Sequence, residues 1–342
     1  MKTVSLNALK RYGSDLLTAG GFSPQCAEDT ADVLVWANAR GTNSHGVLRI
    51  PRYIEMVEKG IIDPEATLTE AEIKGAVAAI DAQKLPGATA MIAAANQATD
   101  LATKFGVGWC SMKNITHAGA VGYYGLQCVK RGCIGIVMSA SKPLMAYHGA
   151  SVSGVSTNPI AVAVPMQGNY PLLLDMSTST VALGKIMHAK DAGTEMPLGW
   201  AIDENGLPTS DPGKVSTLTP LGGPKGSGLS LMIEVLASVL ISNPVISEAL
   251  AGNKSSMNGL VIAVHVNGFT NQDQFAQQII SLVTALKGLP KADGVDEILM
   301  PGERGFKMAE VRSTEGIPLP EGTINRLADL ANRLNVQSPT FI

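Results

Sequence analysis

The hydrophobic and polar positions of the first 60 residues recur with helical spacing. A capping serine precedes apolar positions three or four residues apart: Ser5, then Leu6, Leu9, Leu16 and Leu17. This pattern predicts a helix that Gly20 and Gly21 end. Ser23-Pro24 then places a capping hydroxyl before a proline suited to a first helical turn, so a second helix is expected to run as far as Gly41.

The pattern changes near residue 76 to short apolar runs that alternate with helical stretches. Strands are predicted at 76–81, 107–112 and 133–139, with helices at 86–106 and 120–132. This alternation is typical of an α/β layer. Apolar runs at 160–165 and 171–177 are separated by "MQGNY", a hairpin-like spacing, which predicts a mixed sheet. Further elements are expected at 228–241 (helix), 259–266 (strand), 273–287 (helix) and 323–334, a helix that could rejoin the N-terminal ones.

Composition and charge exclude several classes of protein. Charged residues make up 16 %, aromatic residues 4 %, and the net charge is −3, which gives no electrostatic footprint for nucleic acid or anionic lipid. The N-terminus lacks the apolar core of a signal peptide. The longest apolar run, "LSLMIEVLASVLI", is interrupted by Glu234 and is shorter than a membrane span. Cys26, Cys110, Cys128 and Cys133 have neither CxxC nor zinc spacing, so we expect reduced thiols, no metal and a cytoplasmic location.

The usual phosphate-binding signatures are missing. No GxGxxG follows a predicted strand, so a classical Rossmann domain is not supported. "GGPKGSG" at 222–228 holds Lys225 and leads into an apolar helix, an arrangement that suits a phosphate but also a plain glycine turn. The lysine is not followed by a hydroxyl, which disfavours phosphoryl transfer.

One short stretch, "RGTNSHGVLRIPR" at 40–52, concentrates polar chemistry. His45 and Arg49 are four residues apart and would share a helical face. Pro51 either lies in the first turn of a helix that starts late or kinks the chain. An arginine binds a carboxylate with two parallel hydrogen bonds, and Ser44 with His45 could hold another oxygen of the same molecule. The alternative is a capped turn that faces solvent.

Other candidate residues follow predicted strands. His117, in "THAG", lies where a strand passes into a helix among small residues, and imidazole exchanges protons near neutral pH, although a lone histidine is often structural. Asn158-Pro159 is a turn with a polar tip. Asp175 ends a strand and could hold a ribose hydroxyl or cap a helix.

Seven stretches together resemble the malate/L-lactate dehydrogenase type-2 family in order and spacing, over almost the whole chain. They are "RGTNSHGVLRIPRYIEMVEKG", "THAG", "STNPIAVAVP", "LDMSTSTVALGK", "NGLPTSDP", "GPKGSGLSLMIEVL" and "PGER". That family includes ureidoglycolate and sulfolactate dehydrogenases, diketogulonate reductase and piperideine-2-carboxylate reductase. The resemblance implies a three-layer α/β/α fold with a mixed sheet, distinct from the classical Rossmann fold. It also implies a helical domain of 1–72 with 305–342, an α/β dinucleotide- and substrate-binding domain of 73–304, and a homodimer with each active site near the interface.

The resemblance also implies an activity and its residues. The expected reaction is NAD- or NADP-dependent oxidoreduction at C2 of a small 2-hydroxy or 2-oxo acid, such as malate, lactate, sulfolactate or ureidoglycolate. His117 is expected to be the general acid/base, and Ser44, His45 and Arg49 the substrate-side cluster, although the roles of the two histidines could be reversed. The expected cofactor contacts are Ser141, Asn158, Asp175, Met176, Ser177, Lys225, Gly302, Glu303 and Arg304.

Several alternatives stay open at this point. Lys142 could meet a second anionic group of the substrate or the 2′-phosphate of NADP, or it could face solvent. Arg49 would also suit an NAD(P)H-dependent reductase of a cyclic imino acid, whose carboxylate it would bind. A non-catalytic sensor is disfavoured, because every residue that the chemistry needs is present.

Overall fold

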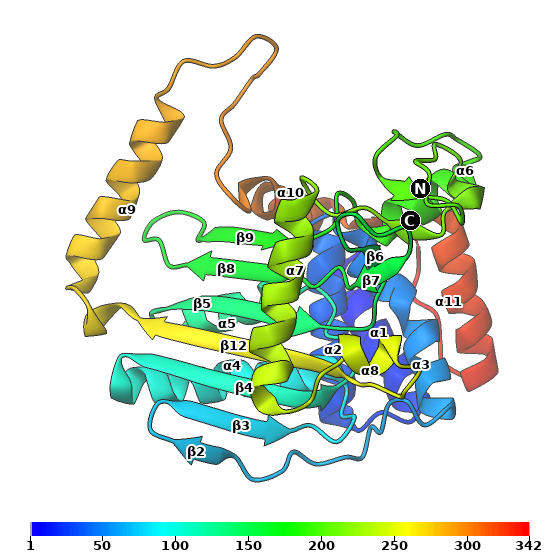
Figure 1. The fold of residues 1–342 in the computed structure, drawn as a ribbon, viewed down its shortest axis with the longest axis horizontal. Coiled ribbons are helices and arrows are strands. Elements are labelled where there is room, and N and C mark those ends of the chain that lie inside the picture. The colour runs from blue at the N-terminus through cyan, green and yellow to red at the C-terminus, as the bar shows by residue number, and fades with distance from the viewer. Residues whose placement is uncertain (1, 342) are drawn as a thin grey trace.

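A seven-stranded sheet forms the centre of the protein (Figure 1). A computed structural model describes residues 2–341, apart from the side chains of His188, Asp191 and Ala192. In spatial order the strands are β2 (Glu72–Lys74), β3 (Val77–Asp81), β4 (Val107–Ile115), β12 (Met257–His265), β5 (Cys133–Ala140), β8 (Ile160–Val164) and β9 (Leu172–Met176).

The strand directions confirm the predicted mixed sheet and place four strand ends together. β3 and β4 are parallel, whereas β12 lies between β4 and β5 and is antiparallel to both. β8 is antiparallel to β5 and to β9, as the hairpin spacing predicted. It follows that β3, β4, β5 and β9 point the same way. Their carboxyl ends share one edge of the sheet, where ligands of α/β proteins gather.

Helices cover both faces of the sheet, which confirms the three-layer architecture. α4 (Gly87–Phe105) and α5 (Gly122–Val129) pack on one face, and α7 (Pro224–Ala237) crosses the other (Figure 1). The many alanines of α4 let it lie very close to the sheet: a Cβ on Gly108 of β4 would collide with the Ala98 carbonyl. On the opposite face, Ile233 and Ala237 of α7 pack against Met138 and Leu260.

A helical part made from both chain ends packs against α4. It contains α1 (Leu6–Ala19), α2 (Pro24–Ala39), α3 (Ile50–Glu58), α10 (Glu303–Glu315) and α11 (Glu321–Leu334). The predicted caps form, since Ser5 and Ser23 accept hydrogen bonds from the amides of Ala8 and Cys26. The two ends are joined where β1 (Lys2–Val4) pairs with β13 (Ile317–Leu319). One continuous core links these helices to the sheet, and the domain division at 72/73 and 304/305 stays a prediction.

The features that were not predicted from the sequence include a second sheet and the direction of the helix expected at 273–287. A small second sheet, with its own core beside α6 (Leu183–Ala192), is built from β6 (Met145–Ala146), β7 (Ser153–Val155), β10 (Ala201–Ile202) and β11 (Thr217–Leu218). The expected helix α9 (Gln272–Lys287) does form, but it projects from the sheet, and the following chain returns to α10 (Figure 1). We call residues 272–302 the arm.

One segment, Pro224–Ile241, is long and apolar enough by composition to cross a membrane. It comprises α7 and the short turn that follows. Helices that pack on a sheet pass the same test, and here Glu234 is buried, with its Oε1 accepting hydrogen bonds from the Val245 and Ile246 amides at 2.7 and 2.9 Å. Glu234 thus fixes the start of α8 (Ile246–Leu250) against α7.

Candidate active site

A large cavity opens at the shared carboxyl-end edge of the sheet. It offers about 530 Å³ to the centres of water-sized molecules, within the range of roughly 300–1,000 Å³ typical of small-molecule and cofactor sites. Its walls come from the turns of residues 42–49, the segment 117–121 after β4, the ends of β5 and β9, and the first turns of α6 and α10. The cavity therefore lies between the sheet and the helical part.

The turns of residues 43–49 position Ser44, His45 and Arg49, the three residues predicted to contact the substrate. Two short 3-10 turns, Asn43–His45 and Val47–Arg49, precede α3, and Pro51 lies in the first turn of that helix, so the late-starting helix is the alternative that occurs. Arg49 Nε donates to the Ser44 carbonyl at 2.8 Å, and Ser44 Oγ lies 3.0 Å from His45 Nδ1. Arg49 is thus anchored to backbone through Nε, which leaves its two terminal nitrogens for other partners.

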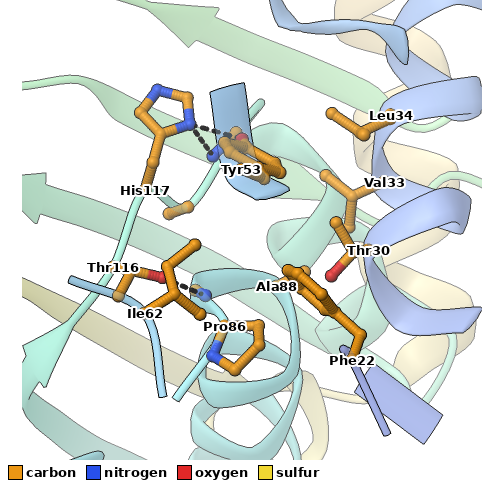
Figure 2. A pocket seen from close by; sticks show the side chains of 13 residues that line it. Phe22, Thr30, Val33, Leu34, Tyr53, Ile62, Pro86, Ala88, Thr116 and His117 are labelled. Carbon is orange, nitrogen blue, oxygen red and sulfur yellow. Dashed lines mark hydrogen bonds between the residues drawn. The ribbon is translucent and has the colours of Figure 1, made fainter. Parts of the chain in front are cut away.

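His117 leaves the end of β4 and faces the same cavity. Its Nδ1 lies 2.6 Å from the Tyr53 hydroxyl and 3.3 Å from the Gly119 amide nitrogen (Figure 2). Its ring stacks on that of His45, with centroids 5.7 Å apart and planes 18° from parallel. The two predicted histidines are therefore neighbours, and both lie beside Arg49 in the cavity wall.

The environment of both histidines disfavours their charged forms. Burial, together with the nearby His45 and Arg49, lowers the pKa of His117 to about 3. Burial and then Arg49 lower the pKa of His45 to about 4. Both rings are accordingly neutral at pH 7 in the free protein, whereas the sequence alone suggested a histidine that titrates near neutral pH.

Asp175, at the end of β9, lines the cavity and also caps a helix. Its Oδ2 accepts a hydrogen bond from the Gly122 amide at 3.1 Å, in the first turn of α5. A Cβ on Gly122 would lie 2.6 Å from that oxygen, so this position needs glycine. Burial raises the pKa of Asp175 to about 6, against the hydrogen bond from Gly122 and the charge of Arg40. The expectation that Asp175 caps the helix that follows it was wrong, since α6 has Ala182 at its N-cap; Asp175 instead caps α5.

Arg40 is a site residue that sequence analysis missed. Its guanidinium lies over the rings of Trp36 and Phe306, 4.9 and 4.0 Å from their centroids, and Nη2 donates to the Gly302 carbonyl at 3.2 Å. Its Nη1 is buried and has no hydrogen-bond partner among the described residues. Only its place as the first residue of the polar stretch 40–52 could have pointed to it.

The cavity wall around Arg40 suits the phosphates of a dinucleotide. Gly302, with φ +84°, immediately precedes α10. The Glu303 amide donates to the Met300 carbonyl at 3.0 Å, so the amides of Arg304 and Gly305 are the first-turn donors beside Arg40 in the cavity wall. Two guanidiniums and a helix N-terminus together attract an anion. The free Nη1 of Arg40 offers a donor without any rearrangement, and the residues present therefore fit a dinucleotide.

Ten of the thirteen predicted site residues line this one cavity. They are Ser44, His45, Arg49, His117, Ser141, Asp175, Met176, Ser177, Gly302 and Arg304. Asn158 is fully buried behind the wall: its Oδ1 accepts from the Ser141 amide at 3.1 Å and its Nδ2 donates to the Ser230 carbonyl at 3.1 Å. Asn158 thus holds Ser141 in place, and its side chain does not face the cavity.

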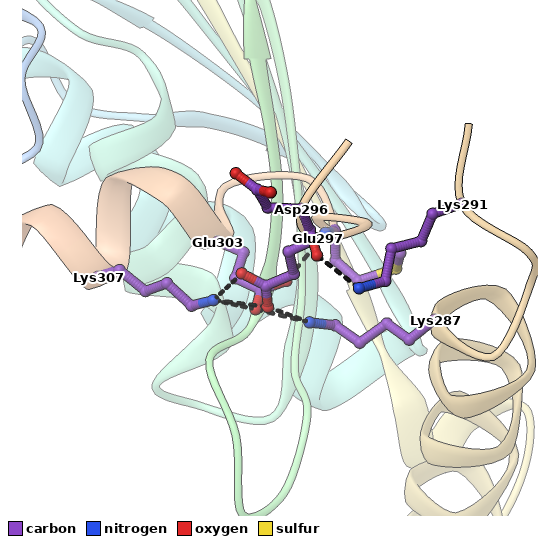
Figure 3. Close-up of polar contacts among 7 residues, drawn as sticks. Lys287, Lys291, Asp296, Glu297, Glu303 and Lys307 are labelled. Carbon is purple, nitrogen blue, oxygen red and sulfur yellow. Dashed lines mark hydrogen bonds and ion pairs between the residues drawn. The ribbon is translucent and has the colours of Figure 1, made fainter. Parts of the chain in front are cut away.

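Glu303 and Lys225 also lie outside the cavity lining. Figure 3 shows Glu303 turned toward Lys287 and Lys307, whose ammonium groups lie 2.7 and 3.1 Å from its carboxylate. Its other oxygen accepts from the Met300 amide at 2.9 Å, so Glu303 ties the arm to α10. Lys225 is exposed in the first turn of α7, and Lys142 is exposed next to Ser141. The structure gives none of these three side chains a place in the cavity wall.

Comparisons with known proteins identify a family of dehydrogenases that this chain resembles in sequence and in fold. Residues 4–328 match the family described as malate/L-lactate dehydrogenase. A malate/(S)-sulfolactate dehydrogenase of Methanothermus fervidus is 32 % identical over 94 % of this chain and 95 % of its own, and an NAD⁺-dependent ureidoglycolate dehydrogenase of Escherichia coli is 31 % identical over 92 % of each. A crystal structure of malate dehydrogenase from Entamoeba histolytica superposes with a TM-score of 0.93 at 27 % identity, covering 99 % of this chain and 100 % of the other. The chain therefore belongs to the malate/L-lactate dehydrogenase family and is an NAD(P)-dependent oxidoreductase of 2-hydroxy acids.

Proposed function

We propose that Arg49 binds the carboxylate of a small 2-hydroxy or 2-oxo acid and that His117 moves the proton of its C2 oxygen. One observation carries this proposal: Arg49, anchored by Nε to the Ser44 carbonyl, and His117 line the same cavity wall, with His45 stacked on His117. An arginine with two free terminal nitrogens pairs with a carboxylate through two parallel hydrogen bonds. The carboxylate and the C2 oxygen of one small acid then reach both residues at once.

The chain's own residues bind, orient and exchange a proton. Ser44 and His45, joined through Oγ and Nδ1, orient the acid beside Arg49. His117 gives a proton to the C2 oxygen in reduction and takes it back in oxidation. NAD(P), when bound, supplies hydride to C2 or accepts it.

The cofactor would be held by other residues of the cavity wall. Arg40, Arg304 and the N-terminus of α10 provide donors for the diphosphate. Asp175 provides an acceptor for a hydroxyl group, and Ser141, Met176 and Ser177 complete the wall. The predicted cofactor roles of Asn158, Lys225 and Glu303 stay predictions.

A spectrophotometric screen at 340 nm tests the reaction. NADH and NADPH are offered separately against 2-oxo acids and a cyclic imino acid, and NAD⁺ and NADP⁺ against malate, lactate, sulfolactate and ureidoglycolate. We expect turnover with one open-chain acid and with either the NAD or the NADP form of the cofactor. Reduction of the cyclic imine alone would move the reaction to a C=N bond. Dinucleotide binding without any turnover would contradict the proposal and favour a sensor.

Variants of the two histidines test the proposed roles. Loss of a general acid/base typically lowers the rate by about 10²–10⁴-fold. We expect His117→Ala to show such a loss in kcat and His45→Ala to raise KM more than it lowers kcat. His148→Ala, an exposed histidine outside the cavity lining, is the control. The opposite pattern would reverse the assignment of His45 and His117.

We also propose a homodimer in which the arm of one copy packs on α7 of the other. α7 has only one face on the sheet, and its outer face and the turn after it expose Met232, Val235, Val239 and Leu240. The projecting α9 exposes Ile280, Leu282 and Leu286. Light scattering should give twice the chain mass for wild type and the mass of one chain for Leu240→Lys or Leu282→Lys. A wild-type monomer would refute the dimer.

The cytoplasmic location and the absence of membrane and nucleic-acid partners stay proposals from composition alone.

A further inference from the structure

Tyr53 is buried directly behind His117, on the side away from the large cavity. It belongs to α3, is 5 % exposed, and its hydroxyl lies 2.6 Å from His117 Nδ1. Figure 2 shows this hydroxyl directed at the ring, with apolar side chains around the rest of the tyrosine. The space beside it offers only about 10 Å³ to the centres of water-sized molecules. Within the described part of the chain, His117 is the hydrogen-bond partner of this hydroxyl.

A second contact fixes where the neutral ring of His117 carries its proton. The Gly119 amide lies 3.3 Å from the same Nδ1. An amide N–H can only donate, so Nδ1 must be unprotonated while this contact exists. The proton of the neutral ring therefore resides on Nε2, the nitrogen that points away from Tyr53 (Figure 2). In this state the Tyr53 hydroxyl donates to Nδ1 as well.

Proton transfer requires other states of the same ring. When the imidazolium gives its Nε2 proton to the C2 oxygen of the substrate, the neutral ring keeps its second proton on Nδ1. The reverse reaction returns the substrate proton to Nε2 and restores the imidazolium. In both of these states Nδ1 carries a proton and needs an acceptor. The Gly119 amide cannot accept, whereas a tyrosine hydroxyl both donates and accepts.

We propose that Tyr53 is a positioning residue whose hydroxyl reverses from donor to acceptor when His117 becomes protonated on Nδ1. This inference rests on the proposed role of His117. Without the hydroxyl, a buried N–H would lack a partner in each working state, while the resting state would keep its contact with Gly119. Leaving a buried donor unsatisfied costs enough to shift an equilibrium about tenfold or more.

The other groups around His117 do not supply this acceptor. The titratable or charged side chains near it are His45 and Arg49 from the 3-10 turns, Tyr53 from α3, Tyr124 from α5 and Asp175 from β9. His45 and Arg49 disfavour the imidazolium. The Tyr124 hydroxyl donates to the Ala118 carbonyl, and Asp175 is bound to the Gly122 amide. Among these side chains, Tyr53 is the one whose hydroxyl contacts His117 Nδ1.

Tyr53→Phe tests the proposal, with Tyr12→Phe as the matched control. Tyr12 is also buried, and its hydroxyl, outside the cavity lining, donates to the Leu327 carbonyl at 3.0 Å and lies 3.1 Å from Ser338 Oγ. Reduction needs the imidazolium, whose population falls as pH rises through the pKa of His117. Tyr53→Phe lowers that pKa, so the fall in kcat should move about one pH unit lower. Above that range kcat should drop about tenfold with little change in KM, and at low pH it should approach wild type.

Nitrogen NMR of ¹⁵N-histidine-labelled protein gives a readout that needs no turnover. In free wild type at pH 7 we expect the His117 proton on Nε2. The Nδ1 resonance should move toward that of an unbonded ring nitrogen in Tyr53→Phe and stay in place in Tyr12→Phe. A proton found on Nδ1, an unmoved resonance, or an equal loss of kcat at every pH would overturn the inference. Absence of turnover in wild type would instead refute the proposed function. The NMR result would still show whether the Tyr53 hydroxyl is hydrogen-bonded to His117 Nδ1.

Discussion

Replacement of Arg49 by alanine should remove the main binding group for the substrate. Because Nε is held by the Ser44 carbonyl at 2.8 Å, the guanidinium presents both terminal nitrogens to a carboxylate without reorientation. Hydrogen bonds to charged groups contribute about 1.5–3 kcal/mol each, so two of them contribute about 3–5 kcal/mol after some overlap. This corresponds to a loss in kcat/KM on the order of a hundred- to a few thousandfold. The carboxylate is bound before and during the reaction, so most of the loss should appear in KM.

The assay compares kcat and KM of Arg49→Ala, Arg49→Lys and Arg52→Ala with the best substrate pair. Arg52 lies one turn further along the chain, with its side chain 53 % exposed and paired with Glu55 at 2.6 Å, so it controls for the loss of a nearby positive charge. Lysine keeps the charge but lacks the two-pronged geometry, and we expect an intermediate loss. Added guanidinium should partly restore the alanine variant. A KM within threefold of wild type for Arg49→Ala, or an equal loss in Arg52→Ala, would refute the proposed carboxylate site.

Two further predictions follow from the charge of Glu303 at the start of α10 and from the charges in the cavity. Burial opposes the Glu303 carboxylate, but hydrogen bonds from Lys287, the Met300 amide and Lys307 hold its pKa at about 2, below its ordinary 4.5. The stability it provides is therefore present above pH 4.5 and is lost as pH falls toward 2. Glu303→Gln should lower the free energy of unfolding in urea by about 1 kcal/mol at pH 7 and by less at pH 3; an undiminished difference at pH 3 would contradict this. Second, an anion on Arg49 should raise the low pKa values of His45 and His117, so binding of the unreactive analogue oxamate with NAD(P)H should take up protons, more at pH 6 than at pH 8. Calorimetry in buffers of different ionisation enthalpy measures this uptake, which His117→Ala should reduce; no uptake at pH 6 would refute it.

Elements with a long periodic pattern could be predicted from the sequence, and short ones could not. The helix at 6–20 and the strand at 107–112 form at nearly their predicted bounds, because several turns or alternations repeat the same signal. The strands of the second sheet are two or three residues long, too short to show an alternation. The start of α10 is not recognisable for another reason. The stretch "PGER" matches a family motif that predicts cofactor contacts, and its Gly302, which adopts φ +84°, gives no helix-capping side chain.

The candidate site was predictable where its residues follow strand ends. His117 and Asp175 are such cases, since the sheet directions bring the ends of β4 and β9 to one edge. Ser141 follows β5 at the same edge, but only the family resemblance pointed to it. A motif gives the type of a side chain but not its direction. The sequence therefore could not predict that the side chains of Asn158 and Glu303 lie outside the cavity lining. Tyr53 reaches His117 across 64 residues of chain. That contact depends on how α3 packs against the segment after β4, which no local pattern contains.

The electrostatics of the cavity make the substrate's own charge part of the proton-transfer site. The described residues that line the cavity include three arginines but one carboxylate, that of Asp175: the arginines are Arg40, Arg49 and Arg304. The net positive charge of this lining favours the binding of anions. Burial, together with His45 and the charge of Arg49, lowers the pKa of His117 to about 3 and so keeps its ring neutral. A bound carboxylate on Arg49 offsets this charge and makes the imidazolium accessible. In the proposed mechanism, proton donation by His117 is therefore available only when an acid occupies the site. A neutral amide of the same size should neither bind well nor promote protonation of His117.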